Sequence, residues 1–404
     1  MTNRKLPRPE PRTLNSEPNL ARAERLVLEL MAIPGKSGEE AGVAAYLREK
    51  RLAAGAPAET IKTDNAHKQA LIAGNTGNLI LKLPGTVKAP RRMLSAHMDT
   101  VPICVGCQPR VQGDFVKSAN PATGLGADNR AGCGTILSAA LEILENKLPH
   151  PPLTFCWFIQ EEVGLYGARC IQQSLLGKPA MCFNWDGGAP EKVTIGATGG
   201  YRMVIEVEGI ASHAGVCPER GVSAIAIASL AIADLTRGGW HGLVQKGKHR
   251  GTSNVGYIHG GEATNVVTDR VSLKAEARSH DSKFRSKLVG EIEKAFKSAA
   301  KELKSSEGRR GSVRLDGRLD YESFLLDRQS ECVRLAEAAV SAVGRQPQQS
   351  ISNGGLDANW LNAHGIPTVT LGCGQVNVHM TSEMLDLPAY RDACRIALRL
   401  ATAT

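Results

Sequence analysis

The sequence contains no apolar run that approaches the roughly 20 residues needed to span a bilayer as a helix. Its first residues, MTNRKLPRPEPRTLNSEP, lack the apolar region of a secretory signal peptide. These absences argue against a membrane protein and a secreted protein. We expect a cytoplasmic protein without a membrane partner, preceded by a basic, disordered arm at residues 1–18.

A disulfide framework is also missing, because the ten cysteines are irregularly spaced along 404 residues. Cys104 and Cys107 form a C-x-x-C pair, and no second pair accompanies it. A zinc knuckle or a redox pair is one interpretation. We favour two reduced thiols in a loop of a cytoplasmic protein.

The formal charge of +9 raises the question of a nucleic-acid partner. Basic residues are spread thinly outside the N-terminal arm and the segment 301–314, and no basic stripe interleaved with aromatic residues is present. We therefore expect no nucleic-acid binding.

The chain is long for a single hydrophobic core, and its apolar and charged fractions, 42% and 22%, are ordinary for a globular protein. Helical spacing of apolar residues covers 20–33, 40–55 and 129–147, and Ser37 and Glu40 have the S-x-x-E spacing of a capping box. Shorter apolar runs at 77–85, 91–99 and 152–160 predict strands. This alternation indicates an α/β domain with a mostly parallel central sheet flanked by helices.

The pattern changes after residue 198. The order β-α-β-β-α-β follows, which is typical of a ferredoxin-like α+β layer, with its elements at 201–209, 222–236, 253–261, 270–280, 282–306 and 312–319. We predict one domain formed by 19–198 and 319–404, and a second domain inserted into it at 199–318.

Residues able to bind metal follow several of the predicted strands. His97 and Asp99 in SAHMDT are two positions apart and share one face of an extended segment, where the carboxylate can hold the second imidazole nitrogen. Taken singly, this pair is more simply a structural one. The adjacent carboxylates Glu161 and Glu162 follow FCWFIQ directly.

Further candidates lie in the turns after other predicted strands. Asp128 lies in the glycine-rich GLGADNRAG before a helix, where its carboxylate could simply interact favourably with the helix dipole. Asp186 follows FNW, and His379 follows PTVTLG. The carboxyl ends of strands in an open α/β sheet converge on one crevice. Several carboxylates gathered there repel one another unless cations are present, and the mixed imidazole and carboxylate set suits a divalent metal, most plausibly zinc.

SAHMDTVP, GLGADNRAG, EEVGLYGA, DGG and NVHMTSE, in this order and with an inserted domain, resemble the M20 family of dinuclear zinc peptidases. The motifs GADNRAG and EEVGLYGAR are similar to those of the peptidase T branch, and the resemblance extends from about residue 20 to the end. It implies two divalent ions, zinc or alternatively cobalt or manganese. Asp128 would bridge them, with His97 and Asp186 on one ion and Glu162 and His379 on the other.

The resemblance also implies that Asp99 orients His97 and that Glu161 is the general base. His213 in SHAG matches the family's lid histidine, which commonly reaches the active site of a partner subunit to stabilise the oxyanion. The resemblance therefore implies that 19–198 and 319–404 form the catalytic domain, and that the inserted domain at 199–318 is a lid and dimerisation domain through which a homodimer forms. Asn265 and Arg278 match substrate-binding positions, and a guanidinium can clamp a carboxylate with two hydrogen bonds.

The sequence differs from the family pattern at Asn353, because many relatives have an arginine just before the two glycines that follow, Gly354 and Gly355. This substitution weakens the case for strict tripeptidase specificity. We therefore expect a dinuclear-metal hydrolase acting on amide bonds of small peptides, in the manner of an aminopeptidase or tripeptidase. The alternatives are an N-acyl or N-carbamoyl amino acid amidohydrolase with the same site, and a catalytically silent protein of the same fold.

Overall fold

The computed structural model describes residues 17–402, so most of the expected N-terminal arm lies outside the described part of the chain. Within that part, the chain divides into two compact units. The first unit runs to Gly196 and resumes over Leu325–Ser352 and from Leu356 onward. The second unit comprises Ala197–Phe324 together with Asn353–Gly355.

The first unit is built on a sheet with the strand order β1-β2-β6-β3-β7-β16-β8-β14, in which β15 also pairs with β8. These strands are β1 (Ile61–Thr63), β2 (Leu79–Leu83), β3 (Arg92–His97), β6 (Leu153–Phe158), β7 (Met181–Trp185), β8 (Lys192–Ala197), β14 (Phe324–Leu325), β15 (Gln348–Ser352) and β16 (Thr368–Leu371). The central strands β6, β3, β7 and β16 are parallel. Outside them, β2 pairs antiparallel with β6, and β8 with β16. The expected α/β class with a mostly parallel central sheet is confirmed.

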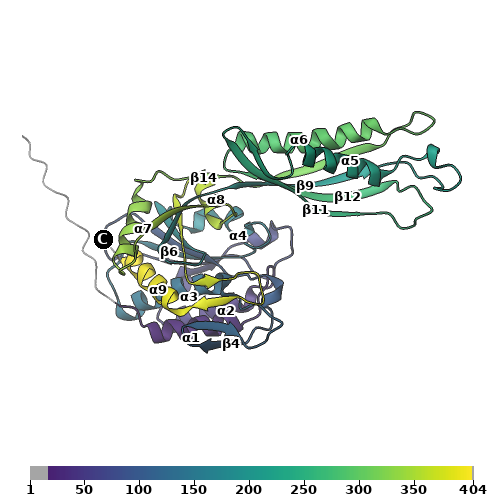
Figure 1. Cartoon of the computed structure of the whole chain (residues 1–404). Helices are drawn as coiled ribbons and strands as arrows, with labels where there is room; N and C mark the ends of the chain where they lie inside the picture. Colours follow the sequence, from purple (N-terminus) through teal and green to yellow (C-terminus); the bar gives the residue numbers. More distant parts are fainter. Residues whose placement is uncertain (1–16, 403–404) are drawn as a thin grey trace, which may run out of the picture. The chain divides into compact units, whose positions relative to one another are not determined.

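Helices cover both faces of this sheet (Figure 1). One core cluster includes α1 (Leu20–Ala32), α2 (Ala41–Ala53), α3 (Ala127–Asn146), α7 (Glu331–Ser341) and α9 (Leu387–Thr402). The short helices α4 (Tyr166–Arg169) and α8 (Asp357–Ala363) belong to the cluster on the other face. The helices expected over 20–33, 40–55 and 129–147 therefore form, with ends shifted by one or two residues.

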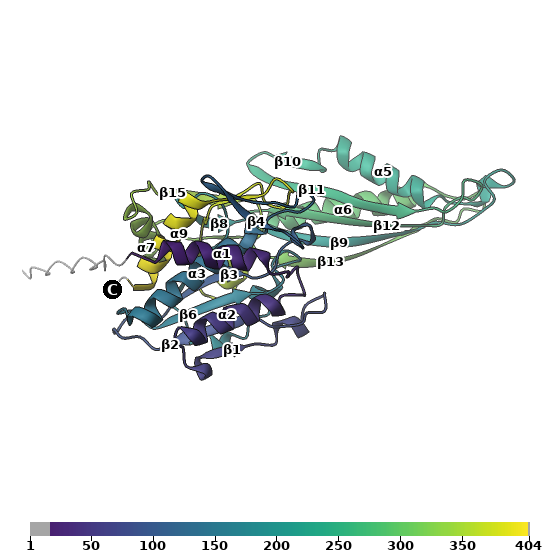
Figure 2. The ribbon, with the colours of Figure 1, turned by 90° about the horizontal axis from the view of Figure 1, so that it is seen from below.

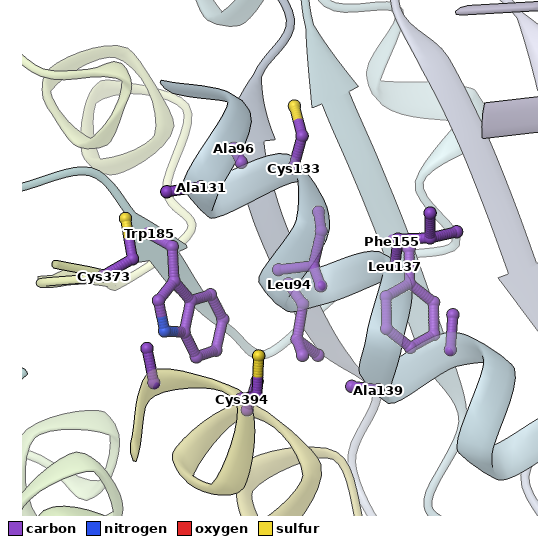
Figure 3. Packing of buried hydrophobic residues seen from close by; sticks show 14 of the residues in the cluster. Leu94, Ala96, Ala131, Cys133, Leu137, Ala139, Phe155, Trp185, Cys373 and Cys394 are labelled. Atoms are coloured by element: carbon purple, nitrogen blue, oxygen red, sulfur yellow. The ribbon is translucent and has the colours of Figure 1, made fainter. Parts of the chain in front are cut away.

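Helix α3 is buried among its neighbours and begins at the edge of the sheet that carries the candidate site. Leu137 of this helix packs in one cluster with Leu94 of β3 and Trp185 of β7 (Figure 3). A Cβ atom at Gly134 would lie 2.7 Å from the hydroxyl oxygen of Tyr390, so glycine allows α3 to pack this closely against α9. This packing fixes the start of α3, where Asp128 lies.

A smaller antiparallel sheet in the first unit carries the last candidate ligand. It contains β4 (Pro109–Gln112), β5 (Phe115–Ser118), β17 (Gln375–Val376) and β18 (Met384–Asp386), in the order β17-β18-β5-β4. His379 lies in the connection between β17 and β18, whose pairing brings Val376 opposite Met384. The backbone of His379 has a φ of 64°, so the connection turns tightly at this residue.

The second unit is an antiparallel sheet with both of its helices on one face (Figure 2). Its elements are β9 (Gly199–Glu208), α5 (Ala224–Arg237), β10 (Gly242–Lys246), β11 (His249–Gly260), β12 (Arg270–Ser279), α6 (Ser282–Glu302) and β13 (Ser312–Tyr321). The strand order β10-β11-β12-β9-β13 contains the ferredoxin-like arrangement with β10 added at one edge.

Three local expectations are wrong. Strand β10 was not expected, because GLVQK is short and mixed in character, and α6 ends at Glu302 rather than Ser306. The capping box does not form: Glu40 is itself the N-cap residue of α2, and the Ser37 hydroxyl donates to Asp99.

The helices within residues 17–402 include none with the length and apolar character needed to cross a membrane.

Candidate metal centre

The residues expected to bind metal come from different elements of the first unit. His97 is the last residue of β3, and Glu161 and Glu162 follow β6. Asp186 follows β7, and Asp128 lies in the first turn of α3. Since β3, β6 and β7 are parallel neighbours, their carboxyl ends bring these side chains to one edge of the sheet.

Asp128 lies between the two histidines. Its Oδ1 is 3.2 Å from Nε2 of His97, and its Oδ2 is 3.4 Å from Nε2 of His379. Nε2 of His379 also lies 2.9 Å from Oε2 of Glu162, while Nε2 of His97 lies 4.0 Å from Oδ2 of Asp186. The carboxylate of Asp128 thus has one oxygen toward each of two groups of potential ligands.

The donor atoms are close enough to share metal ions. Ligand atoms of His97, Asp128 and Glu162 all lie within 4.8 Å of one another, and the same holds for His97, Glu161 and Asp186. Oδ1 of Asp128 is buried, and its 3.2 Å contact with Nε2 of His97 lacks the geometry of a hydrogen bond. A buried carboxylate oxygen without a donor is costly unless a cation satisfies it, so this donor set fits divalent metal ions.

The protonation equilibria show how strongly these groups interact. Burial raises the pKa of Glu161 well above its usual range against the charge of His97, and the carboxylates of Asp186 and Glu162 add to the rise. Hydrogen bonds to Asp128 and Glu162 raise the pKa of His379 to about 10. Burial opposes ionisation of Asp128, but its contacts with His379 and His97 hold its pKa below the ordinary value. Added positive charge is what this cluster requires.

Asp99 organises the strand ends from behind the ligands. Its Oδ1 accepts a hydrogen bond from the backbone N–H of Glu161 at 2.9 Å, and its Oδ2 accepts one from the backbone N–H of Glu162 at 3.2 Å. Oδ2 also accepts from the Ser37 hydroxyl at 2.7 Å, and Oδ1 lies 3.4 Å from Nδ1 of His97. Nδ1 of His97 also lies 3.1 Å from the backbone carbonyl oxygen of Asp99, so this residue fixes the imidazole as well as both neighbouring glutamates.

Asn129 connects the start of α3 with the end of β7. Its Nδ2 donates to the carbonyl oxygen of Trp185 at 2.6 Å, and its Oδ1 accepts from Nε2 of Gln375 at 3.0 Å. Asp128 directly precedes Asn129 in the sequence, and Asp186 directly follows Trp185. The side-chain amide of Asn129 thus holds the backbone segments of these two carboxylates together.

The remaining expected residues belong to the second unit. The backbone N–H of Ala214 donates to the carbonyl of Asn265 at 2.9 Å, so His213 and Asn265 are neighbours, and both are exposed. Arg278 donates through Nε and Nη2 to both carboxylate oxygens of Glu276, at 3.0 and 2.9 Å.

Asn353 contacts a histidine that sequence reasoning did not single out. Its Oδ1 lies 3.1 Å from Nε2 of His280, and both side chains are exposed. The spacing of the two residues, 73 positions apart, gives no signal of this contact.

Two other residues of the centre were missed as participants. Ser37 was interpreted as a helix cap, whereas its hydroxyl binds Asp99. Glu383 stands in the NVHMTSE segment and accepts three backbone hydrogen bonds near Asp128, a contact between residues more than 250 positions apart. Local spacing could not reveal the partner of either side chain.

Comparison with known proteins establishes the family. The model of peptidase family M20/M25/M40 matches residues 93–403. The chain belongs to this peptidase family. The expected recognition and enzyme class are confirmed.

Individual relatives agree with this assignment over nearly the whole chain. This M20 peptidase is 31% identical over 360 residues to the uncharacterized protein YqjE of Bacillus subtilis, covering 89% of the chain and 92% of that protein. A tripeptidase structure from Staphylococcus aureus has a TM-score of 0.86 at 30% identity, covering 96% and 99% of the two chains. The aminopeptidase PepT structure from Bacillus cereus has a TM-score of 0.82 at 29% identity, covering 95% and 98%. The expected likeness to peptidase T is confirmed.

Proposed function

We propose that the chain is a dinuclear-metal exopeptidase that hydrolyses small peptides, in the manner of an aminopeptidase or tripeptidase. The placement of Asp128 between His97 and His379 is the observation that carries this proposal. The resemblance to a tripeptidase and to PepT at about 30% identity supports the choice of substrate class.

In this proposal, the ligand roles are those that the family resemblance implies. His97 and Asp186 would hold one ion, Glu162 and His379 would hold the other, and Asp128, which lies near both histidines, would serve both ions. Two divalent cations, with zinc as the proposed metal, would supply a water of lowered pKa and a Lewis acid for the scissile carbonyl. Imidazole and carboxylate ligands also accept cobalt or manganese, so metal analysis decides among them.

Glu161 has the role of the base. Its carboxylate takes a proton from the attacking water and delivers it to the amine nitrogen that leaves when the C–N bond breaks. Asp99 accepts a hydrogen bond from the backbone N–H of Glu161 and so fixes the backbone from which this carboxylate projects. Every proposed ligand and the base are present, which argues against a catalytically silent relative.

The second unit supports a homodimer as part of the proposal. Asn265, the neighbour of His213, precedes β12 in the chain. Arg278 lies eight residues after Arg270, the first residue of β12, and an extended strand of that length spans about 26 Å. A small peptide cannot reach across that distance. We assign Arg278 to the carboxylate of the substrate, and His213 and Asn265 to the reaction centre of a partner subunit.

The cysteines support a reducing compartment. All ten are free, and most of them are buried in apolar cores. Free thiols are typical of cytosolic proteins, because glutathione in the cytosol keeps cysteines reduced. We therefore propose a cytoplasmic location.

Metal analysis combined with a substrate screen tests the proposed function. We expect two divalent ions per chain and release of the first residue from tripeptides, with N-acyl and N-carbamoyl amino acids as poor competitors. Turnover of N-acyl amino acids without turnover of peptides would select the amidohydrolase alternative. Protein that binds no metal at millimolar concentration would remove the mechanism altogether.

A further inference from the structure

Glu383 connects the loop that carries His379 with the loop that carries Asp128. Its side chain is almost fully buried. Oε2 accepts hydrogen bonds from the backbone N–H groups of Leu125 at 2.9 Å and Gly126 at 2.7 Å, and Oε1 accepts one from the N–H of Asp128 at 3.0 Å. One carboxylate thus receives three N–H donors from the segment that delivers Asp128 into the centre.

The N-cap position of that segment offers no side-chain acceptor for the first N–H groups of α3. The N-cap residue of α3 is Gly126, with a φ of 76°, and it offers no capping oxygen. The N–H groups at a helix start lack partners within the helix, and a negative charge is favourable there. Glu383 provides both the acceptors and the charge from a distant part of the sequence.

The backbone of Glu383 belongs to the His379 loop. Its N–H donates to the carbonyl of Met380 at 3.1 Å, which closes the turn directly after His379. The side chain of Glu383 therefore links the backbone of Asp128 to the loop of His379. In this arrangement Oδ2 of Asp128 lies 3.4 Å from Nε2 of His379.

We propose that Glu383 is a positioning residue that sets Asp128 against His379 before metal arrives, and thereby determines the affinity of the centre for divalent ions. This inference rests on the proposed metal-dependent function. Glu383 contacts the backbone of one ligand and shares a loop with the other. Groups that orient ligands in this way typically contribute 10- to 100-fold in metal affinity.

A cobalt titration of the full chain, stripped with a chelator and followed by visible absorption, tests this inference without relying on turnover. We expect Glu383→Gln to weaken cobalt binding by 10- to 100-fold, because an amide cannot accept N–H bonds on both of its termini. Cobalt affinity equal to that of the unmodified chain would overturn the inference.

Asp64→Asn is the matched control. Asp64 is also buried in the first unit and accepts backbone N–H bonds from Ala66, Asn78 and Gln172, none of which is a proposed ligand. Both variants should lower the melting temperature, but only Glu383→Gln should change cobalt affinity. An equal loss of affinity in Asp64→Asn would reduce Glu383 to a general stabilising role and refute the proposal.

Hydrogen exchange of the metal-free, unmodified chain provides a second test if Glu383→Gln fails to fold. The amides of Leu125, Gly126 and Asp128 should be protected without metal, and rapid exchange at all three would overturn the inference. The two proposals fail separately. A chain that binds no cobalt contradicts the metal-dependent function, whereas tight binding unaffected by Glu383→Gln contradicts only the positioning role.

Discussion

The backbone N–H of Glu161 donates a 2.9 Å hydrogen bond to Oδ1 of Asp99, and this bond explains how two adjacent carboxylates can do different work. The next N–H, that of Glu162, donates to the other oxygen of the same carboxylate. With the backbone held at both residues, the side chains of Glu161 and Glu162 diverge. Glu162 reaches His379, while Glu161 lies within ligand distance of His97 and Asp186.

Glu161→Gln should keep both metal ions and lose turnover. The amide preserves the shape of the side chain but cannot take a proton, and general base catalysis typically contributes 10²- to 10⁴-fold. We expect kcat to fall within this range, measured by peptide hydrolysis alongside metal content. Glu162→Gln is the comparison, since it should lose metal as well as activity. Near-normal turnover of Glu161→Gln would remove the assigned base.

Ser37→Ala should affect metal binding rather than helix stability. The hydroxyl donates to Oδ2 of Asp99 and makes no helix cap, so we expect several-fold weaker metal affinity. Ser223→Ala is the contrasting control, because Ser223 caps α5 by accepting from the N–H of Ala226. That variant should lose about 1 kcal/mol of stability with unchanged metal affinity. Calorimetric metal titration and chemical denaturation of both variants distinguish the two roles.

Glu40 should make stability depend on pH between about 4.5 and 7. Burial, followed by the charge of Asp99, raises the pKa of Glu40 to about 7. A folded-state pKa above the unfolded value means that the contribution is fully present below pH 4.5 and is lost as pH rises through 7. Gln cannot ionise, so the Glu40→Gln variant does not lose stability as this group deprotonates. Its free energy of unfolding, relative to that of the unmodified chain, should therefore rise by up to about 3 kcal/mol as the pH increases from 4.5 to above 7.

Denaturant unfolding of chelated protein at pH 4.5 and pH 8 measures this difference. Glu49 is an exposed residue of α2, the helix that Glu40 precedes, and Glu49→Gln is the control variant. Its stability relative to the unmodified chain should be the same at both pH values. A Glu40→Gln variant whose stability difference stays constant across the two pH values would contradict the expectation.

Arg278→Ala should raise KM for peptides with a free carboxyl terminus. The guanidinium is held in a bidentate pair with Glu276, which fixes its orientation while leaving the group partly exposed. We expect at least a tenfold rise in KM with a smaller change in kcat, and little effect on peptides with an amidated terminus. Arg314→Ala serves as the control, since Arg314 is an exposed arginine paired with Asp316 in the same sheet. Equal effects on free and amidated peptides would argue against carboxylate recognition.

The strand ends of the first unit could be predicted from the sequence because apolar periodicity is a local signal. Runs such as RRMLSAH and LTFCWF carry their own evidence of a strand, and the next polar residues then lie at the edge of the sheet. Asp99 could be recognised for the same reason, since it is two residues from His97.

Contacts between distant segments could not be predicted in this way. Ser37 and Glu40 have the spacing of a capping box, and only the position of β3 shows that the hydroxyl binds Asp99 instead. Glu383 meets Gly126 across 257 positions, so no spacing in the sequence indicates the contact. Strand β10 was missed because its pairing with β11, rather than its own composition, makes it a strand.

Thiol burial gives the protein a convenient experimental property. Eight of the ten cysteines are buried, and the two with intermediate exposure, Cys170 and Cys217, belong to different compact units. The natural chain therefore already carries one accessible attachment point for a dye on each unit. Donor and acceptor fluorophores at these two cysteines can test whether the distance between the units changes when a peptide is added, without any engineered cysteine.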